Sequence, residues 1–365
     1  MSQSGHPEGT GAVTHSRLGQ HPTLTASSGE ETAYPLISVI IPTLYRPDLL
    51  MERALSSAFG QTHHNLEVLV IVDGPDPGTQ AALSRVQDPR LRVHVLPVNS
   101  GPSDARNAGV QLSQGKWIAL LDDDDEWFPD KLARQLECAL KSRHAFPVVF
   151  SGWITRTPAG DTLNPHRLKP QDQPFGDYLL ARSSPALPEC FLTTSMTFAP
   201  KELLTRLPFS AGMRKHEDWD WMLRAEQVAG VGFEQLPLHE TSALAVYHHA
   251  ENRHFASQHT DWAPSLAWAQ GHREAGRLSE RAFAGFIIAQ LAPFPAAVYD
   301  LRGFLALSRA LRSTRPNLYE ALRYLKLWVI PAPVRRTLKN GLLQLTRLVR
   351  GPSALLRRRD PVSHR

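Results

Sequence analysis

The sequence has few cysteines and no long apolar run. Only Cys138 and Cys190 occur among its 365 residues, which excludes a disulfide framework and favours a cytoplasmic location. A membrane span needs roughly eighteen uninterrupted apolar residues, and the best candidate, residues 285–301, is interrupted by two prolines, a glutamine and an aspartate. Residues 1–34 are polar and rich in Gly, Ser, Thr and His, which does not fit a signal peptide. We interpret them as a disordered leader.

Acidic residues are scarce near the C-terminus. Residues 301–365 hold 15 Lys or Arg and two acids, a net charge of +13 in a chain whose total is +5. Apolar residues spaced four, three and four apart recur within 318–329 and 338–349, which predicts basic amphipathic helices. They would either bind an anionic membrane surface or pack on the preceding domain. The tail lacks interleaved aromatics and any nucleic-acid-binding motif, so we expect no nucleic-acid partner.

Apolar strands alternate with helices in the first part of the chain. We expect strands at 37–43, 66–72, 91–96, 117–121 and 148–150, and helices at 47–59, 77–86, 103–113 and from Pro129 onward, the last with Leu132, Leu136 and Leu140 on one face. Strands that are apolar throughout indicate a parallel sheet covered by helices, hence an α/β fold. Residues 151–250 are less regular, and a helical pattern follows residue 255. The sequence therefore predicts a leader (1–34), an α/β domain (35–250) and a basic helical extension (251–365).

Polar segments follow three of the predicted strands. In parallel sheets, active sites lie beyond the carboxyl ends of the strands, where this sequence places Pro42-Thr43-Leu44, Asp73 and Asp122-Asp123-Asp124-Asp125. An aspartate run after a buried strand can hold a hard divalent cation through oxygen ligands. Its plainer role would be a solvated turn that caps a helix.

A second acidic cluster, Glu217-Asp218-Trp219-Asp220-Trp221, lies about ninety residues further on. A carboxylate beside aromatic residues can act as a general base on a sugar hydroxyl. The same acids also suit an ordinary helix N-terminus, where the helix dipole favours negative charge. The two tryptophans would either present apolar faces to sugar rings or pack in the core.

Four stretches together resemble a known family. They are ISVIIPTLYRPDLL, LEVLVIVDG, SDARNAGVQLSQGKWIALLDDDDEWFPDKL, and TTSMTFAPKELL followed by HEDWDWMLRA. In this order and at this spacing, residues 36–250 resemble the family 2 inverting nucleotide-sugar glycosyltransferases, whose fold is GT-A. The resemblance implies an α/β fold with a mostly parallel sheet flanked by helices, here followed by a helical C-terminal extension.

The resemblance also assigns roles to individual residues. Asp73 matches the acid that contacts the nucleobase. Asp122 and Asp124 match the DxD-type motif that binds ribose and diphosphate through Mn²⁺ or Mg²⁺, with Asp124 as direct metal ligand, and Asp218 matches the catalytic base. The predicted donor-binding set is Pro42, Thr43, Leu44, Asp73, Arg106, Asp122, Asp123 and Asp124, and further candidates are Glu217, Trp219 and His249.

Some positions leave alternatives open. Arg106 would contact the donor phosphates or form a salt bridge that holds the acidic loop. His248 and His249 would reach the metal or phosphates, or simply pack. Leu44 stands where the family often has a tyrosine, and Val72 replaces the commoner first aspartate before Asp73. These two departures bear on the nucleobase, for which uridine is the family's commonest choice.

The expected function is an inverting, metal-dependent transfer of a sugar from a nucleotide-diphosphate donor, most often a UDP-sugar, to a glycan or lipid-linked acceptor. The resemblance places this reaction in bacterial cell-surface polysaccharide or glycolipid assembly. The basic tail predicts that the protein is cytoplasmic and lies peripherally on the cytoplasmic face of the inner membrane. One alternative is a sugar nucleotidyltransferase, which normally needs a Gly-rich phosphate loop near the first strand that is absent here. Another is a non-catalytic scaffold that binds membrane or nucleic acid. The presence of Asp73, Asp122, Asp124 and Asp218 argues against it.

Overall fold

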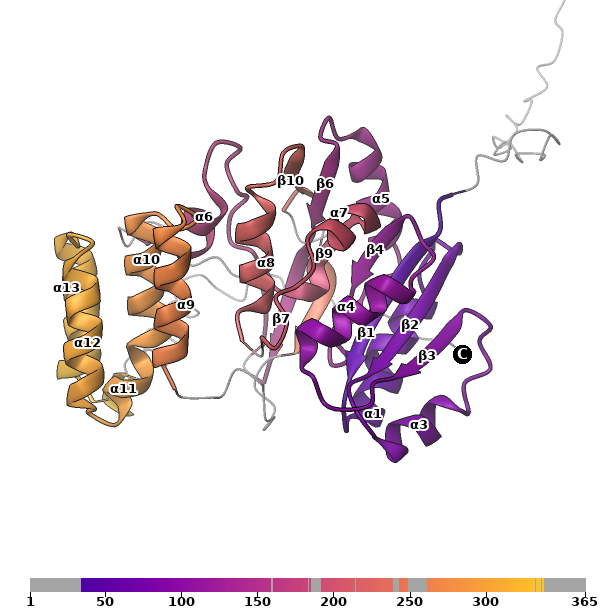
Figure 1. The fold of residues 1–365 in the computed structure, drawn as a ribbon, viewed down its shortest axis with the longest axis horizontal. Coiled ribbons are helices and arrows are strands. Elements are labelled where there is room, and N and C mark those ends of the chain that lie inside the picture. The colour runs from indigo at the N-terminus through magenta and orange to yellow at the C-terminus, as the bar shows by residue number, and fades with distance from the viewer. Residues whose placement is uncertain are drawn as a thin grey trace, which may run out of the picture. The chain divides into compact units, whose positions relative to one another are not determined.

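The computed structural model describes residues 34–158, 160–182, 184, 192–213, 215–238, 243–248, 261–331, 333–335 and 337 (Figure 1). The described residues from Pro35 onward belong to one compact unit. Three predictions lie outside the described residues: the leader apart from Tyr34, the candidate His249, and the apolar repeat at 338–349.

A seven-stranded sheet forms the centre of the fold, in the order β10-β6-β9-β4-β1-β2-β3. Its strands are β1 (Ile37–Thr43), β2 (Leu66–Val72), β3 (Leu91–Val95), β4 (Trp117–Leu120), β6 (Phe146–Phe150), β9 (Thr197–Pro200) and β10 (Val231–Gln235). Only β9 runs antiparallel to its neighbours in this sheet. The predicted mostly parallel sheet is confirmed, because strands buried on both faces need apolar side chains at nearly every position.

The predicted helices of the first half are present. The expected helix at 47–59 consists of α1 (Pro47–Leu49), a π-helical segment (Leu50–Leu55) and α2 (Ser56–Phe59), and it is followed by α3 (Pro77–Leu83), α4 (Pro102–Leu112) and α5 (Lys131–Lys141). Helix α4 packs across β1 and β2, and α5 across β6 and β9 (Figure 1).

The predicted apolar face of α5 is wrong at its end. Leu132 and Leu136 are buried, but Leu140 is 64% exposed. Residues four apart drift by about 40° around a helix, so the third leucine has turned away from the sheet, and Gln135 and Ala139 complete the buried face instead.

A second sheet of four strands was not predicted. It has the order β5-β11-β7-β8 and comprises β5 (Glu126–Trp127), β7 (Gly152–Thr157), β8 (Gly160–Asn164) and β11 (Ala243–His248). The aspartate run therefore connects the two sheets, since β4 of the first sheet ends at Leu120 and β5 of the second begins at Glu126.

Helices dominate the rest of the described chain, as the sequence predicts beyond residue 255. They are α6 (Phe175–Leu180), α7 (Lys201–Arg206), α8 (Glu217–Ala225), α9 (Ala263–Glu274), α10 (Glu280–Phe286), a π-helical segment (Ile287–Leu291), α11 (Pro293–Ala297), α12 (Leu301–Arg312) and α13 (Leu318–Val329). Their buried side chains join those of the central sheet in one continuous apolar core. In the described part of the chain, no helix is long and apolar enough to cross a membrane.

Candidate active site

The four side chains of the aspartate run differ in how deeply they are buried. Asp123 has no exposed surface and accepts a hydrogen bond from Thr43 Oγ1 at 2.7 Å. Asp125 is also buried and accepts one from Ser195 Oγ at 2.6 Å. The side chains of Asp122 and Asp124 keep 31% and 12% exposure. Asp122, one of the pair predicted to bind metal, is therefore partly exposed, and Asp124, the other, is largely buried beneath Arg46. Thr43 and Asp123 contact each other inside the fold.

Ser195 holds the run in place and was not singled out in the sequence. It lies in the short 3₁₀ turn Thr194–Met196 before β9. Besides donating to Asp125, its hydroxyl accepts the backbone N–H of Asp122 at 3.0 Å, and its carbonyl accepts the indole N–H of Trp127 at 2.9 Å. Both ends of the run are thus fixed by one residue.

Two arginines neutralise the run. Arg46 lies 2.7 Å from Asp123 Oδ1 through Nη2 and 2.9 Å from Asp124 Oδ2 through Nη1. The buried Arg106 donates to Asp122 Oδ1 at 2.7 Å and to Glu217 Oε1 at 3.0 Å. Arg106 therefore joins the aspartate run to the second acidic cluster, as the salt-bridge interpretation predicts. Arg46, three residues beyond the end of β1, was missed.

Burial shifts the pKa of several of these groups. It raises the pKa of Asp123 to about 7, with a contribution from Asp124 and against the opposing effect of Arg46. It also raises the pKa of Asp125 well above its ordinary value. Burial would lower the pKa of Arg106, but its two carboxylate partners outweigh burial and raise it, so Arg106 remains a cation.

Asp218 lies in the first turn of α8. His216 precedes the helix in a left-handed conformation (φ 63°), and Asp218 Oδ1 accepts the backbone N–H of Trp219 at 2.8 Å. Desolvation, and next the charge of Glu217, raise the pKa of Asp218 to about 8. Such a carboxylate binds a proton more readily than an ordinary aspartate, a property that suits a general base.

Trp219 packs in the core. It is 7% exposed, and its ring lies 5.6 Å from that of His216 and 6.4 Å from that of Phe286. His216 also stacks on Trp268 of α9 at 5.0 Å, and burial lowers its pKa to about 3, so it packs as a neutral aromatic ring. The packing interpretation holds for Trp221 as well, which is 1% exposed.

Asp220 connects α8 to the C-terminal helices. Its carboxylate is within hydrogen-bond distance of His272 Nε2 (2.8 Å) and accepts from Trp268 Nε1 (3.1 Å), both on α9. Its other oxygen accepts from Arg224 and Ser210, each at 2.7 Å. Burial would raise the pKa of Asp220, but these partners outweigh burial and lower it. The sequence indicated no role for Asp220, because its two partners on α9 lie 48 and 52 positions away in the chain.

Asp73 is buried at the end of β2. Its two carboxylate oxygens accept the backbone N–H groups of Ser100 (2.8 Å) and Gly101 (2.9 Å), immediately before α4. It therefore fixes the start of the helix that carries Arg106. Contact with a nucleobase stays a prediction for Asp73, as it does for Pro42 and Leu44, which are partly exposed at the end of β1.

His248, on β11, lies within hydrogen-bond distance of Glu126 in the second sheet. Its Nε2 lies 2.7 Å from Glu126 Oε1, and Arg53 lies 3.9 Å from the same oxygen. This arrangement matches the packing interpretation of His248.

Asp122 and Asp124 suit a cation that binds together with a diphosphate. Within the described residues, no group of three or more His, Cys, Asp or Glu side chains forms a complete metal site. Mg²⁺ is usually held by one or two carboxylates plus substrate phosphates, not by an all-protein cage. Asp122 and Asp124 fit this mode of binding, in which substrate phosphates complete the ligand set. Their oxygens suit Mn²⁺ equally well.

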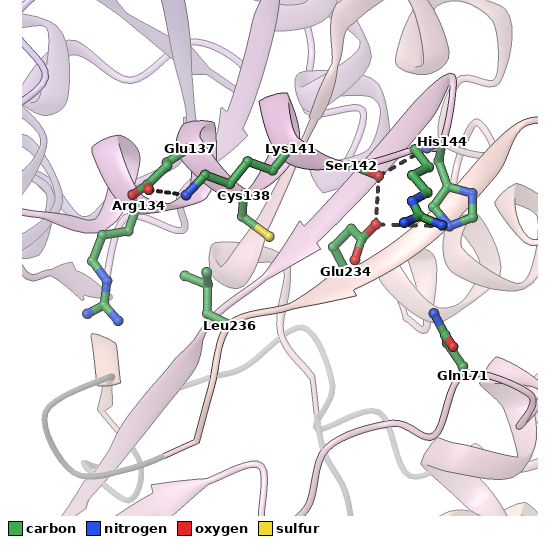
Figure 2. A pocket seen from close by; sticks show the side chains of 10 residues that line it. Arg134, Glu137, Cys138, Lys141, Ser142, His144, Gln171, Glu234 and Leu236 are labelled. Carbon is green, nitrogen blue, oxygen red and sulfur yellow. Dashed lines mark hydrogen bonds and ion pairs between the residues drawn. The ribbon is translucent and has the colours of Figure 1, made fainter.

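A cavity of about 690 Å³ lies elsewhere, between α5 and the edge strand β10. Figure 2 shows Glu137 paired with Lys141 at this cavity, and Glu234 accepting from Ser142. No residue of the predicted site lines it, so it lies apart from the acidic clusters.

Comparison with known proteins identifies the family. Residues 38–207 match the model of glycosyl transferase family 2. The chain is 33% identical over 147 residues to TuaG of Bacillus subtilis, described as a teichuronic acid biosynthesis glycosyltransferase, covering 40% of this chain and 57% of TuaG. It is 32% identical over 111 residues to the Escherichia coli UDP-Glc:alpha-D-GlcNAc-diphosphoundecaprenol beta-1,3-glucosyltransferase WfgD, covering 30% of this chain and 44% of WfgD. The chain thus spans about half the length of these relatives. It carries a glycosyltransferase domain of family 2, which confirms the predicted family.

A solved structure confirms the fold. Residues 1–349 of TarS from S. aureus, crystallised with UDP-GlcNAc, superpose with a TM-score of 0.53 at 17% identity, covering 84% of this chain and 92% of that chain. The fold is therefore the predicted GT-A fold, with a mostly parallel sheet, flanking helices and a helical C-terminal region.

Proposed function

We propose that this protein transfers a sugar from a nucleotide-diphosphate donor to an acceptor hydroxyl, with inversion at the anomeric carbon. The observation that carries the proposal is the position of Arg106, which bonds both Asp122 in the aspartate run and Glu217 beside Asp218. One buried side chain thereby links the candidate donor motif to the residue next to the candidate base, which favours the fixed relative position of reacting groups that speeds a single displacement.

The donor would bind at the carboxyl ends of β1, β2 and β4. Asp122 and Asp124 would hold Mn²⁺ or Mg²⁺ through their carboxylate oxygens. When bound, such an ion supplies Lewis-acid stabilisation for the negative charge that builds on the departing diphosphate. Asp123 and Asp125 are buried and hydrogen-bonded, so their role is to fix the turn that presents the other two.

Asp218 would take the proton from the acceptor hydroxyl. It lies at the N-terminus of α8, where the helix dipole favours the ionised form, while desolvation and Glu217 favour the protonated form and raise its pKa. The acceptor oxygen then attacks the anomeric carbon opposite the diphosphate, and one such displacement inverts the configuration. Glu217, already bonded to Arg106, would orient this turn of the helix.

Relatives support a UDP-sugar donor and a lipid-linked acceptor. The printed name of WfgD specifies a UDP-glucose donor and a diphosphoundecaprenol-linked acceptor, and the TarS structure contains UDP-GlcNAc. We extend this chemistry to the present chain and place it in bacterial cell-surface polysaccharide or glycolipid assembly.

We also propose peripheral attachment to an anionic membrane, on the cytoplasmic face of the inner membrane. The apolar residues of α13 spaced four, three and four apart are between 48% and 75% exposed: Leu318, Leu322, Leu325 and Val329. Among the described residues, none of these four side chains belongs to the buried apolar core. Exposed basic residues lie nearby on α12 and α13, among them Arg309, Arg312 and Lys326. Each basic residue near an anionic surface contributes about 1 kcal/mol.

Product analysis tests the proposed reaction. The purified protein is incubated with Mn²⁺, a panel of UDP-sugars and a polyprenyl-diphosphate-linked sugar, and the product is examined by NMR. We expect UDP release and a new glycosidic bond of configuration opposite to that of the donor. Retention of configuration would contradict the mechanism. Pyrophosphate release from a sugar 1-phosphate and a nucleoside triphosphate would instead indicate the nucleotidyltransferase alternative.

A further inference from the structure

Arg46 is positioned by a constrained loop at the end of β1. Tyr45 adopts a positive φ of 56°, and its backbone N–H donates to Asp76 Oδ2 at 2.6 Å. Non-glycine residues rarely adopt this conformation, and the hydrogen bond holds it in place. Arg46 follows directly and precedes α1, so its backbone is fixed before its side chain reaches the aspartate run.

The guanidinium of Arg46 contacts two carboxylates of different character. One nitrogen lies 2.7 Å from Asp123, whose side chain is fully buried and also bound by Thr43. The other lies 2.9 Å from Asp124, whose side chain keeps 12% exposure. The Arg46 side chain itself is 40% exposed. One terminal nitrogen of the guanidinium is therefore bound to a buried carboxylate. The other contacts an oxygen of Asp124, the proposed metal ligand.

We propose that Arg46 acts as a resident counter-cation on Asp124 and makes divalent-cation binding depend on the donor's diphosphate. This inference rests on the proposed function, in which Asp124 binds Mn²⁺ or Mg²⁺. A guanidinium and a divalent cation on the same carboxylate repel each other at short range. A diphosphate removes the conflict, because it adds negative charge and accepts hydrogen bonds from the planar arginine fork. Arg46 would then transfer its outer contact from Asp124 to a phosphate while it keeps Asp123.

A purely structural role makes a different prediction. If Arg46 serves only to neutralise the buried Asp123, its replacement lowers stability but leaves the cation affinity and its dependence on nucleotide unchanged. The two roles are therefore separated by a binding measurement that does not involve catalysis.

The test measures Mn²⁺ binding to the full chain by electron paramagnetic resonance, with and without UDP. In the wild type, Mn²⁺ alone should bind weakly and UDP should strengthen its binding. In Arg46→Gln, Mn²⁺ alone should bind about tenfold more tightly, because the competing charge is gone. The increase in Mn²⁺ affinity that UDP causes should become smaller by the same factor. Arg53→Gln is the matched control: its guanidinium donates to the backbone carbonyl of Asp124, so it removes an equal charge nearby without freeing the carboxylate.

The outcomes are distinguishable. Equal Mn²⁺ affinities in wild type and Arg46→Gln, with UDP still strengthening both, would overturn the inference and leave the metal proposal standing. An absence of Mn²⁺ binding to the wild type even with UDP would overturn the metal proposal and this inference with it. If Arg46→Gln does not fold, Arg46→Met replaces it. Methionine keeps an apolar stem without the charge, so Mn²⁺ alone should still bind more tightly, and an unchanged affinity would overturn the inference.

Discussion

Arg106 and Glu217 lie 111 positions apart in the chain, yet Arg106 Nη1 donates to Glu217 Oε1 at 3.0 Å. The other terminal nitrogen of the same guanidinium donates to Asp122. A bidentate arginine of this kind sets geometry as well as charge. The distance between the aspartate run and the N-terminus of α8 is thus set by one buried side chain.

Replacing Arg106 should damage stability and activity together. In Arg106→Gln two carboxylates lose a buried partner, which typically costs about 3–5 kcal/mol of unfolding free energy. Turnover should also fall at least about tenfold, because small displacements of reacting groups are costly. Arg206→Gln, which breaks an exposed pair with Glu202, should cost no more than about 1 kcal/mol. Urea denaturation and steady-state kinetics measure both effects. Near-wild-type turnover in a folded Arg106→Gln would show that this link is dispensable.

The pH dependence of activity should report Asp218. A base must be deprotonated to act, and desolvation and Glu217 raise the pKa of Asp218 to about 8. We therefore expect kcat/KM to increase with pH and level off above about pH 8. Asp218→Asn should spare donor affinity and reduce turnover by about 10²–10⁴-fold, as is typical of general-base loss. A flat profile between pH 6 and 9 would count against Asp218 as the base.

The same pKa shift predicts that Asp218 destabilises the fold at neutral and alkaline pH. The ordinary pKa is 3.8 and the folded-state pKa is about 8, so the unfolded chain ionises first as the pH rises. The stability contribution of this group is therefore greatest below about pH 4 and declines until about pH 8. Asp218→Asn removes the dependence and should have a higher Tm than the wild type at pH 8, with a smaller difference at pH 5. Asp130→Asn, at an exposed aspartate, is the control in the same calorimetric series.

Removing the carboxylate of Asp124 should weaken donor binding. Asp124→Asn removes a charged ligand from the proposed cation site, so UDP affinity in the presence of Mn²⁺ should fall at least about tenfold. Chelation by EDTA should have the same effect on the wild type and none on the variant. Titration calorimetry measures both. Undiminished UDP affinity of the wild type in chelator would contradict metal-assisted binding.

Membrane binding should depend on the exposed stripe of α13. We predict that the full chain floats with anionic liposomes at low salt and less at high salt, and that Leu322→Gln combined with Leu325→Gln reduces flotation. Removing α13 altogether is a poorer test, because Tyr324 is buried and Glu320 pairs with Arg281. Leu140→Gln, at an exposed leucine of α5, is the matched control. Equal flotation of all forms with neutral and anionic vesicles would refute the proposal.

The sequence predicted those parts of the fold that local pattern determines. The apolar runs at 37–43 and 66–72 became β1 and β2 with the expected bounds, because strands buried on both faces admit little else. The second sheet escaped prediction, since β5 has two residues and β8, with the sequence GDTLN, lacks an apolar run. These two strands form because they pair with neighbouring strands, and their own sequences do not predict them.

The same distinction applies to the candidate site. Asp122, Asp124 and Asp218 could be proposed from the sequence because acidic residues next to a buried strand or a helix start form a recognisable pattern. Arg46, Ser195 and Asp220 were missed because each acts on a group at least 52 positions away. Nothing in their immediate surroundings indicated these contacts, and only the folded chain brings the partners together.

The contacts of Asp220 limit how parts of this enzyme family can be exchanged. Its carboxylate is shared between Arg224 on its own helix and Trp268 and His272 on α9. A chimaera whose new C-terminal helices lacked equivalents of Trp268 and His272 would leave this carboxylate buried with half of its partners missing. Recombination preserves the contacts when α8 and α9 come from the same parent. Any acceptor preference that resides in the C-terminal helices would then be inherited together with the helix that carries the base.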